Sequence, residues 1–303
     1  MAGAMRILMA VAQYPFPVAG GLERQAHELA LALVRRGHDV HALSTRFAPG
    51  QGAEQTLGAV AVHRIAWSRS RALRFAVQPL GLARAMLRLR RRIDVVHVHN
   101  VSWFGAWVTL LAQAEGLPVL TKLPNIGAWG IPGMRAAPCG ALRVRLLARS
   151  DAIAAMTRDS VNELAAIGYP PQRVLRVVNG IAVAPPTATA SGATPVVVVF
   201  AGRLAAEKGL PDLLHAWRIV AARASRPVRL RLMGEGPQAP LLRDLSAGLG
   251  IDASVELAGH CTDVAAQLRR AHVFVLPSLA EGNSNAILEA MSAALPVVAT
   301  RVG

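Results

Sequence analysis

Short apolar runs alternate along the chain with longer segments whose apolar residues recur every three or four positions. The runs have lengths typical of strands, and the segments between them have the period of amphipathic helices. In the first half, strands are predicted at residues 6–11, 39–44, 60–66, 94–99, 118–122, 151–156 and 173–178. In the second half, they are predicted at 196–200, 228–233, 254–257, 273–276 and 297–299. This alternation predicts an α/β fold with parallel sheets.

The pattern restarts once, which indicates two domains. Residues 181–195 are rich in Ala, Thr and Pro and poor in large apolar side chains, as expected of an extended linker. We predict two doubly wound parallel-sheet, Rossmann-like domains, 1–180 and 196–303, that face a cleft. A length of 303 residues fits two domains better than one. Sheets of this kind bind ligands beyond the carboxyl ends of their strands.

Composition favours a globular cytoplasmic protein. The chain is 53% hydrophobic but has no uncharged apolar run of about 18 residues, so no membrane-spanning helix is predicted. The first 13 residues are too short and too strand-like for a signal peptide. Cys139 and Cys261 have no partner at a suitable spacing, which argues against a disulfide framework and a zinc site.

The net charge of +15 is concentrated in the first half. Residues 1–180 carry 22 Lys and Arg against 9 Asp and Glu, whereas residues 181–303 carry 11 against 9. Arginines crowd the acid-free stretch between Glu54 and Asp94: Arg64, Arg69, Arg71, Arg74, Arg84, Arg88, Arg90, Arg91 and Arg92. Their mixture with apolar residues suits a face on anionic lipid at the inner membrane, and an arginine-biased, solvated helix is the alternative. No nucleic-acid-binding motif accompanies the charge, so no nucleic acid is expected as a partner.

The segment after the strand at 196–200 offers cations for a diphosphate. Gly202 lets the backbone turn, Arg203 supplies a planar fork, and Lys208 supplies a point charge just before a helix with an apolar stripe at Leu210, Leu213, Leu214 and Trp217. Of the 33 Lys and Arg residues, only Lys122 and Lys208 are lysines, which suggests a need for a compact amine. A basic loop with a surface salt bridge is the alternative interpretation.

A second chemical segment follows the strand at 273–276. Glu281 lies in a loop, and Glu289 lies two turns into a helix that begins near Ser284. A helix start attracts phosphate, and carboxylates accept hydrogen bonds from sugar hydroxyls. The predicted apolar stripe of this helix is Ile287, Leu288, Met291, Ala294 and Leu295. Asn285 and Glu289 then share the opposite side, where a merely solvated Glu289 is the alternative.

These segments resemble the signatures of retaining glycosyltransferases of the group 1, or family 4, type. Glu281 and Glu289 match the double-glutamate signature, and 202–209 match the Gly-Arg-Leu…Glu-Lys-Gly motif. Further similarities are the glycine loop at 20–23, the strand end at 178–181 and the turn at 234–237. By resemblance, the donor-binding residues are Gly20, Gly21, Gly202, Arg203, Lys208, Gly234, Glu235, Gly236, Glu281, Gly282, Asn283, Ser284, Asn285 and Glu289.

The resemblance implies the GT-B fold and transfer of a sugar, with retention, from a nucleotide diphosphate sugar. Arg203 and Lys208 would hold the diphosphate, Glu281 the sugar ring and Glu289 the ribose, with Glu281, Arg203 and Lys208 as the catalytic set. The absence of an Asp-x-Asp motif argues against a metal-bridged diphosphate, so no metal or other cofactor is expected. The acceptor would be a lipid-linked or polysaccharide precursor of the cell envelope, bound to the basic domain.

On the acceptor side we place His99, Asn100 and Lys122. His97 and His99 share one face of a strand, and no third ligand is suitably spaced for zinc. A buried, hydrogen-bonded histidine is the default for such a pair, and His99-Asn100 at the strand end is a candidate for a polar contact with the acceptor. After strand residues 118–120, many family members place a histidine that touches the donor sugar, and here the residues are 121–124. Either Lys122 replaces that histidine and contacts an anionic acceptor or donor, or the contact is absent.

The resemblance also implies that the second domain is incomplete. Family members continue beyond the strand at 297–299 with further elements and a helix that returns to the first domain, so a truncated copy is expected. Two alternatives to a glycosyltransferase remain: a nucleotide-sugar epimerase on the same fold, or an inactive remnant that binds only nucleotide or membrane.

Overall fold

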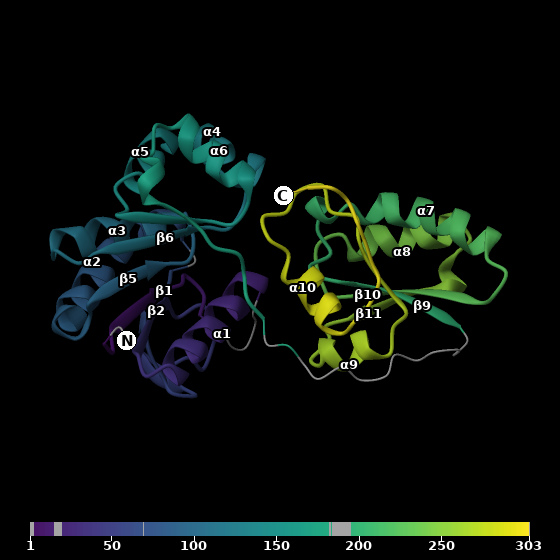
Figure 1. Ribbon diagram of the computed structural model, residues 1–303, viewed down its shortest axis with the longest axis horizontal. Helices are drawn as coiled ribbons and strands as arrows, with labels where there is room; N and C mark the ends of the chain where they lie inside the picture. Colours follow the sequence, from purple (N-terminus) through teal and green to yellow (C-terminus); the bar gives the residue numbers. More distant parts are fainter. Residues whose placement is uncertain (1–2, 15–19, 69, 182, 184–194, 303) are drawn as a thin grey trace. The chain divides into compact units, whose positions relative to one another are not determined.

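The computed structural model describes residues 3–14, 20–68, 70–181, 183 and 195–302, without the side chains of 71–76. The chain forms two compact units, Met1–Asn179 and Gly180–Gly303 (Figure 1). The linker predicted at 181–195 lies almost entirely outside the described residues, so the domain boundaries built on it stay a prediction. Within the described residues, no helix is both long enough and apolar enough to cross a bilayer.

The first unit contains an eight-stranded sheet in the order β3-β4-β2-β1-β5-β6-β7-β8. All neighbouring strands are parallel except the pair β3–β4. The strands are β1 (Arg6–Ala10), β2 (Asp39–Thr45), β3 (Glu54–Leu57), β4 (Val60–Ile65), β5 (Val95–Val98), β6 (Val119–Leu123), β7 (Ala152–Ala155) and β8 (Val174–Arg176).

Helices pack on both faces of this sheet, and the alternation of side chains along β1 shows how. Leu8 and Ala10 join a core with α2 and α3, whereas Ile7, Met9 and Val11 join a separate core with α1. A third core joins β6 and β7 to α4, α5 and α6. The helices are α1 (Gly21–Arg35), α2 (Arg71–Leu89), α3 (Trp103–Ala114), α4 (Ile131–Ala136), α5 (Gly140–Leu147) and α6 (Arg158–Ala166).

The second unit contains a wholly parallel five-stranded sheet in the order β11-β10-β9-β12-β13. Its strands are β9 (Val196–Ala201), β10 (Val228–Met233), β11 (Val255–Gly259), β12 (Val273–Leu276) and β13 (Val297–Ala299). Its helices are α7 (Leu210–Arg223), α8 (Ala239–Gly248), α9 (Val264–Arg269) and α10 (Asn285–Ser292). The single-turn 3-10 helices of the two units are Arg90–Arg92, Gly127–Trp129, Pro171–Arg173, Ala206–Lys208 and Asp252–Ser254.

The predicted α/β class and parallel sheets are confirmed, and each predicted strand is present within two residues at either end. The predicted apolar stripe of α7 packs into the core of the second unit. One strand was not predicted. Its residues, Glu54 to Leu57, are largely exposed and polar, and β3 forms because its backbone pairs antiparallel with β4.

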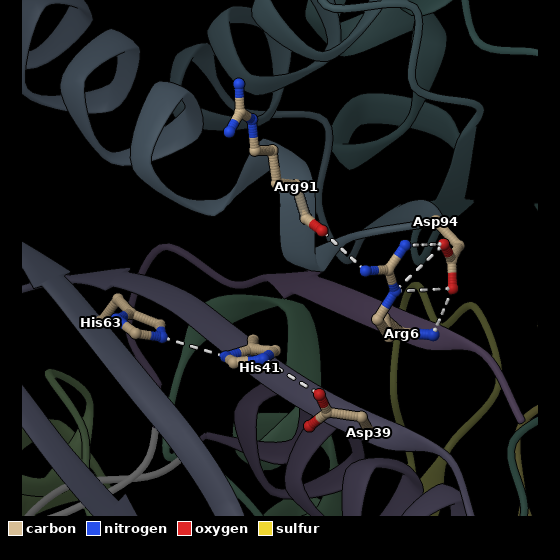
Figure 2. Close-up of polar contacts among 6 residues, drawn as sticks. All are labelled: Arg6, Asp39, His41, His63, Arg91 and Asp94. Carbon is tan, nitrogen blue, oxygen red and sulfur yellow. Dashed lines mark hydrogen bonds and ion pairs between the residues drawn. The ribbon is translucent and has the colours of Figure 1, made fainter.

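An ion pair fixes the amino ends of two central strands of the first sheet. The Arg6 guanidinium donates to both carboxylate oxygens of Asp94, with Nη2 at 2.6 Å from Oδ1, and also to the carbonyl of Arg91 (Figure 2). Asp94 accepts the Arg6 backbone N–H as well. This contact lowers the pKa of the Asp94 carboxyl. It sets where β1 and β5 begin relative to each other.

Two turns of the second sheet meet main chain to main chain. Gly234, which follows β10, has a φ of 138°, and a Cβ built on it would lie 1.9 Å from the carbonyl oxygen of Gly202. Gly236 approaches the carbonyl of Leu204 in the same way, with a Cβ distance of 2.3 Å. The Leu204 N–H donates to the carbonyl of Glu235. Only glycine permits this packing, because any side chain would displace the turn after β9.

We expect Gly234→Ala to destabilise the second unit by at least about 2 kcal/mol, through backbone strain and the clash with Gly202. Gly248→Ala is the matched control, since Gly248 ends α8 with no atom within 4 Å of a built Cβ. There alanine should be neutral or stabilise by roughly 0.5–1 kcal/mol. Urea unfolding of both variants provides the measurement, and equal midpoints would contradict the packing argument.

Candidate functional site

The predicted donor residues of the second unit lie around the switch point of its sheet. From the central strand β9, the sheet continues to β10 on one side and to β12 on the other. The loops after β9 and β12 therefore emerge side by side at the carboxyl edge, the usual ligand position in such sheets. The loop after β9 carries Arg203 and Lys208, and the loop after β12 carries Glu281.

Lys208 and Glu281 form an ion pair across these two loops. The Lys208 ammonium Nζ donates to Glu281 Oε1 at 2.6 Å, and the same oxygen accepts the Ser278 hydroxyl at 2.7 Å. The two side chains are 19% and 14% exposed, so the pair is largely shielded from water but remains reachable. The structure thus brings two predicted catalytic residues into direct contact, which was not predicted.

Arg203 is also paired with a carboxylate. Its Nη2 lies 2.9 Å from Oε1 of Glu207, four residues further along the chain, and its side chain is 68% exposed. Partial burial would raise the pKa of the Glu207 carboxyl, but its own backbone N–H together with Arg203 and Lys208 outweighs burial and lowers it. Glu207 therefore stays ionised between the two cations. The sequence signal for it, an Arg-x-x-x-Glu spacing, was overlooked.

Backbone contacts hold the loops after β9 and β12 together. The Leu279 N–H donates to the carbonyl of Glu207 at 2.8 Å. Gly209, at φ 60°, begins the connection into α7, and a Cβ there would lie 2.3 Å from the carbonyl oxygen of Pro277. The two glycines of the predicted diphosphate-binding segment therefore have different roles. Gly209 is required by this main-chain contact, whereas Gly202, at φ 157°, turns the backbone where a Cβ would lie 3.1 Å from the Phe200 ring.

The helix predicted near Ser284 is α10, with Ser284 as its N-cap residue and no side-chain capping bond from that residue. Gly282, Asn283 and Ser284 lie in the half-buried loop before it, and Asn285 and Glu289 are also half-buried. The predicted stripe is wrong at Met291, which is 62% exposed. Ala290 is fully buried instead and packs with Ala286 and Ile287, so the buried face is rotated from the prediction.

The glycine turn at Gly234-Glu235-Gly236 contacts the loop after β9 through its backbone. Glu235 is exposed, and its carbonyl, rather than its carboxylate, makes the contact with Leu204. The three predicted segments of the second unit therefore form one continuous edge. The assignment of the turn to donor binding stays a prediction.

In the first unit, the predicted residues divide between two groups. Gly20 is the N-cap of α1, and Gly21 is the first residue of that helix. Lys122, at the carboxyl end of β6, is 7% exposed. Its ammonium donates to Gln25 Oε1 of α1 at 2.5 Å and to Asn179 Oδ1 at 2.6 Å. Burial lowers the pKa of Lys122 to about 8.

His97 and His99 lie on one face of the first sheet, as predicted, with ring centroids 4.1 Å apart. The expectation of a hydrogen-bonded histidine is wrong for His99, which is fully buried and has no partner at either ring nitrogen in the described residues. Burial lowers the pKa of His97 to about 4, and lowers that of His99 as well, with Lys122 contributing to both shifts.

Asn100 has a local role at the start of α3. Its Oδ1 accepts hydrogen bonds from the N–H and the hydroxyl of Ser102, which is the N-cap residue of that helix. A neutral pair of imidazoles beside a buried amine thus lies near the end of β5, while Asn100 fixes the following turn. Gln25 is the member of this group that sequence reasoning missed, because nothing local marks a glutamine within α1.

Comparison with known proteins identifies the family. The family described as Glycosyltransferase Family 4 matches residues 19–184, more than half of the chain, and that described as Glycosyl transferases group 1 matches residues 195–303. This protein belongs to the family 4, group 1 glycosyltransferases. The predicted resemblance is confirmed.

Relatives and solved structures agree with this assignment. The chain is 30% identical to glycogen synthase of Mycobacterium tuberculosis over 99% of this chain and 78% of that enzyme. It is 27% identical to a subunit of the phosphatidylinositol N-acetylglucosaminyltransferase of Arabidopsis thaliana, over 99% and 68%. Anabaena HepE, solved with UDP-glucose, superposes with a TM-score of 0.77 at 19% identity, over 99% and 81%. WaaG, of lipopolysaccharide biosynthesis, gives 0.70 at 16%, over 98% and 81%.

We expect Lys208→Met to destabilise the second unit by roughly 1–3 kcal/mol, because it leaves the shielded Glu281 carboxylate without its cation. Adding Glu281→Gln should recover most of that loss. Arg203→Met, in the same loop but largely exposed, should change stability by less than about 1 kcal/mol. Chemical denaturation of the wild type, Lys208→Met, Glu281→Gln, the double variant and Arg203→Met measures the coupling. Additive effects of Lys208→Met and Glu281→Gln would argue against the ion pair.

The buried Lys122 should leave a signature in the pH dependence of stability. The folded lysine loses its proton near pH 8, whereas the unfolded one holds it up to about 10.5. Between these values the unfolded state binds more protons, so stability rises with pH. The Tm of the wild type relative to Lys122→Met should therefore increase from pH 8 to 10.5. Parallel Tm profiles for the two proteins would mean that the amine is not desolvated.

Proposed function

We propose that this protein transfers a sugar from a nucleotide diphosphate sugar to a glycan or lipid-linked acceptor, with retention of the anomeric configuration and without a metal ion. The observation that carries the proposal is the placement of Arg203, Lys208 and Glu281 on two adjoining loops at the switch point of the second sheet. Two cations, a carboxylate and the start of α10 thus lie near one another at the carboxyl edge of the second sheet.

The proposed chemistry is electrostatic. As the bond between sugar and diphosphate breaks, negative charge develops on the leaving diphosphate, and preorganised cations stabilise that charge most. The Arg203 fork would bind two phosphate oxygens, and Lys208 would contribute a compact charge. Glu207 and Glu281 hold both cations in place without ligand, which reduces the reorganisation required on binding. Glu281 and Glu289 would accept hydrogen bonds from hydroxyls of the sugar and the ribose.

The donor class has support from the solved structures. HepE was solved with UDP-glucose, and the pneumococcal O-GlcNAc transferase GtfA with UDP and GlcNAc. Retention rests on the family resemblance alone. The absence of an Asp-x-Asp motif is the support for metal-independent transfer.

The acceptor is proposed to bind the basic first unit. His99, Asn100 and Lys122 are the residues of this unit that we assign to the acceptor side. A lipid-linked or envelope polysaccharide acceptor has support from two relatives, one named as a lipopolysaccharide core glycosyltransferase of Rhizobium meliloti and the other as part of a phosphatidylinositol N-acetylglucosaminyltransferase. The arginine-rich stretch 64–92 would contact the anionic inner face of the membrane from the cytoplasm. Arg69 and the side chains of Arg71 and Arg74 lie outside the described residues.

Titration calorimetry with UDP, and with GDP as a second probe, tests the diphosphate site. Arg203→Gln should weaken nucleoside diphosphate binding about tenfold, since one charge-assisted bidentate contact is lost. Arg223→Gln, on an exposed residue at the end of α7, removes the same charge from the same unit and should leave affinity unchanged. Equal affinity in both variants, or failure of both nucleotides to bind the wild type, would contradict the assignment.

The reaction itself distinguishes the alternatives. Incubation with a panel of nucleotide sugars and NMR analysis of the products should give a new glycoside with the anomeric configuration of the donor. An inverted product would refute retention. An isomerised nucleotide sugar would identify an epimerase, and tight nucleotide binding with no turnover would identify a binding remnant.

A further inference from the structure

The first unit contains a basic pocket beside β2 and β4. Lys122 and His99 belong to β6 and to the end of β5, which lie on the other side of β1 in the same sheet. The pocket has a volume of about 490 Å³ and lies among α2, the following turn and the ends of β2 and β4. Its lining includes five arginines and a histidine: Arg46, Arg64, Arg84, Arg88, Arg92 and His63. A volume of this size is typical of sites for small ligands.

Helical periodicity places three of these arginines on one side of α2 and its following turn. Arg84, Arg88 and Arg92 follow one another at intervals of four residues, with Gly81 and Ala85 as the small residues that line the pocket between them. Like charges at this spacing destabilise a helix unless an anion lies among them. The arrangement is therefore unfavourable by itself and becomes favourable with a bound anion.

The charges of the pocket are not neutralised by the described residues. Arg46, Arg84, Arg88 and Arg92 are exposed, and none of them forms an ion pair in the part of the chain that the structure describes. The carboxylate in the lining, Glu54, is 78% exposed and lies 3.9 Å from His63 Nδ1 rather than beside an arginine.

Two lining residues of β4, the buried Arg64 and the half-buried His63, are held by fixed partners. Arg64 is 5% exposed, donates through Nη1 to Gln55 Oε1 at 2.9 Å, and has no partner for its Nε within the described residues. His63 Nε2 lies 3.1 Å from His41 Nδ1, and the other ring nitrogen of His41, Nε2, lies 3.5 Å from Asp39 Oδ2 (Figure 2). These contacts hold His63 against the sheet, so an anion would meet a preformed surface on one side and three adaptable guanidinium groups on the other.

We propose that this pocket binds a phosphate or diphosphate group of an anionic ligand, as a second anion site besides the donor site. Guanidinium forks match phosphate oxygens in pairs, and several forks around one cavity suit a compact polyanion. The group could come from a free phosphorylated molecule or from a lipid headgroup. The site shares no residue with the Arg203–Lys208 loop, which lies in the other unit, so either assignment can fail without the other.

Hydrogen exchange of the full-length protein with inorganic pyrophosphate as the probe tests the proposal. Pyrophosphate should slow amide exchange in segments 43–54 and 81–92. The double variant Arg84→Gln/Arg88→Gln should weaken the apparent affinity for pyrophosphate, measured from the protection of these segments, at least about tenfold. Arg90→Gln/Arg91→Gln is the matched control: it removes the same charge from the same region, at residues outside the pocket lining. Protection in segment 202–209 reports the donor site separately and should be the same in both variants.

Absence of protection in 43–54 and 81–92 would overturn the proposal, as would an equal loss in both double variants, which would indicate only diffuse charge. Co-sedimentation with phosphatidylglycerol vesicles then identifies the source of the phosphate. If the pocket variant sediments less than its control and pyrophosphate displaces the wild type, the site binds a lipid headgroup. If both variants sediment alike while only the pocket variant loses pyrophosphate protection, the site binds a free anion.

Discussion

Direct contact between main chains organises the carboxyl edge of the second sheet. Gly234 lies against the carbonyl of Gly202, Gly236 against that of Leu204, and Gly209 against that of Pro277. These contacts leave no room for a side chain, so the loops after β9, β10 and β12 hold one another in place. Arg203 and Lys208 lie in one of these loops, so their positions are fixed by the same contacts. A preorganised cation stabilises developing charge better than one that must first move into position.

The cations of this protein occupy three different electrostatic environments. Arg203 and Lys208 each have a carboxylate partner that orients the cation. An incoming anion would have to share the cation with that carboxylate. Lys122 is buried among neutral amide oxygens, so its charge is desolvated and its pKa lowered. The arginines of the pocket beside α2 have no ion-pair partner in the described residues, so an anion there would gain their full attraction. Net charge alone conceals these differences.

The rarity of lysine has a physical interpretation. Arginine keeps its charge when buried, because its guanidinium remains protonated at any physiological pH. An ammonium group is compact, donates in three directions, and changes its pKa readily. Both lysines of this chain lie in shielded positions with short contacts to side-chain oxygens, at Glu281 and at Gln25 with Asn179. The wider guanidinium fork would not fit the same contacts without moving the loops.

The sequence by itself determined the order and type of nearly all strands and helices, since burial imposes a local period on the chain. It also placed Arg203, Lys208 and Glu281 in loops that follow strands, which is where open sheets bind ligands, and Glu289 within the helix after the second of these loops. Only the tertiary structure decided the partners. Lys208 meets Glu281 across 73 positions and Lys122 meets Gln25 across 97, and no local pattern records such distances. The buried face of α10 was decided in the same way, by packing against strands of its sheet. Strand β3 was decided by backbone pairing with β4, its neighbour in the chain, because its own side chains show no burial pattern.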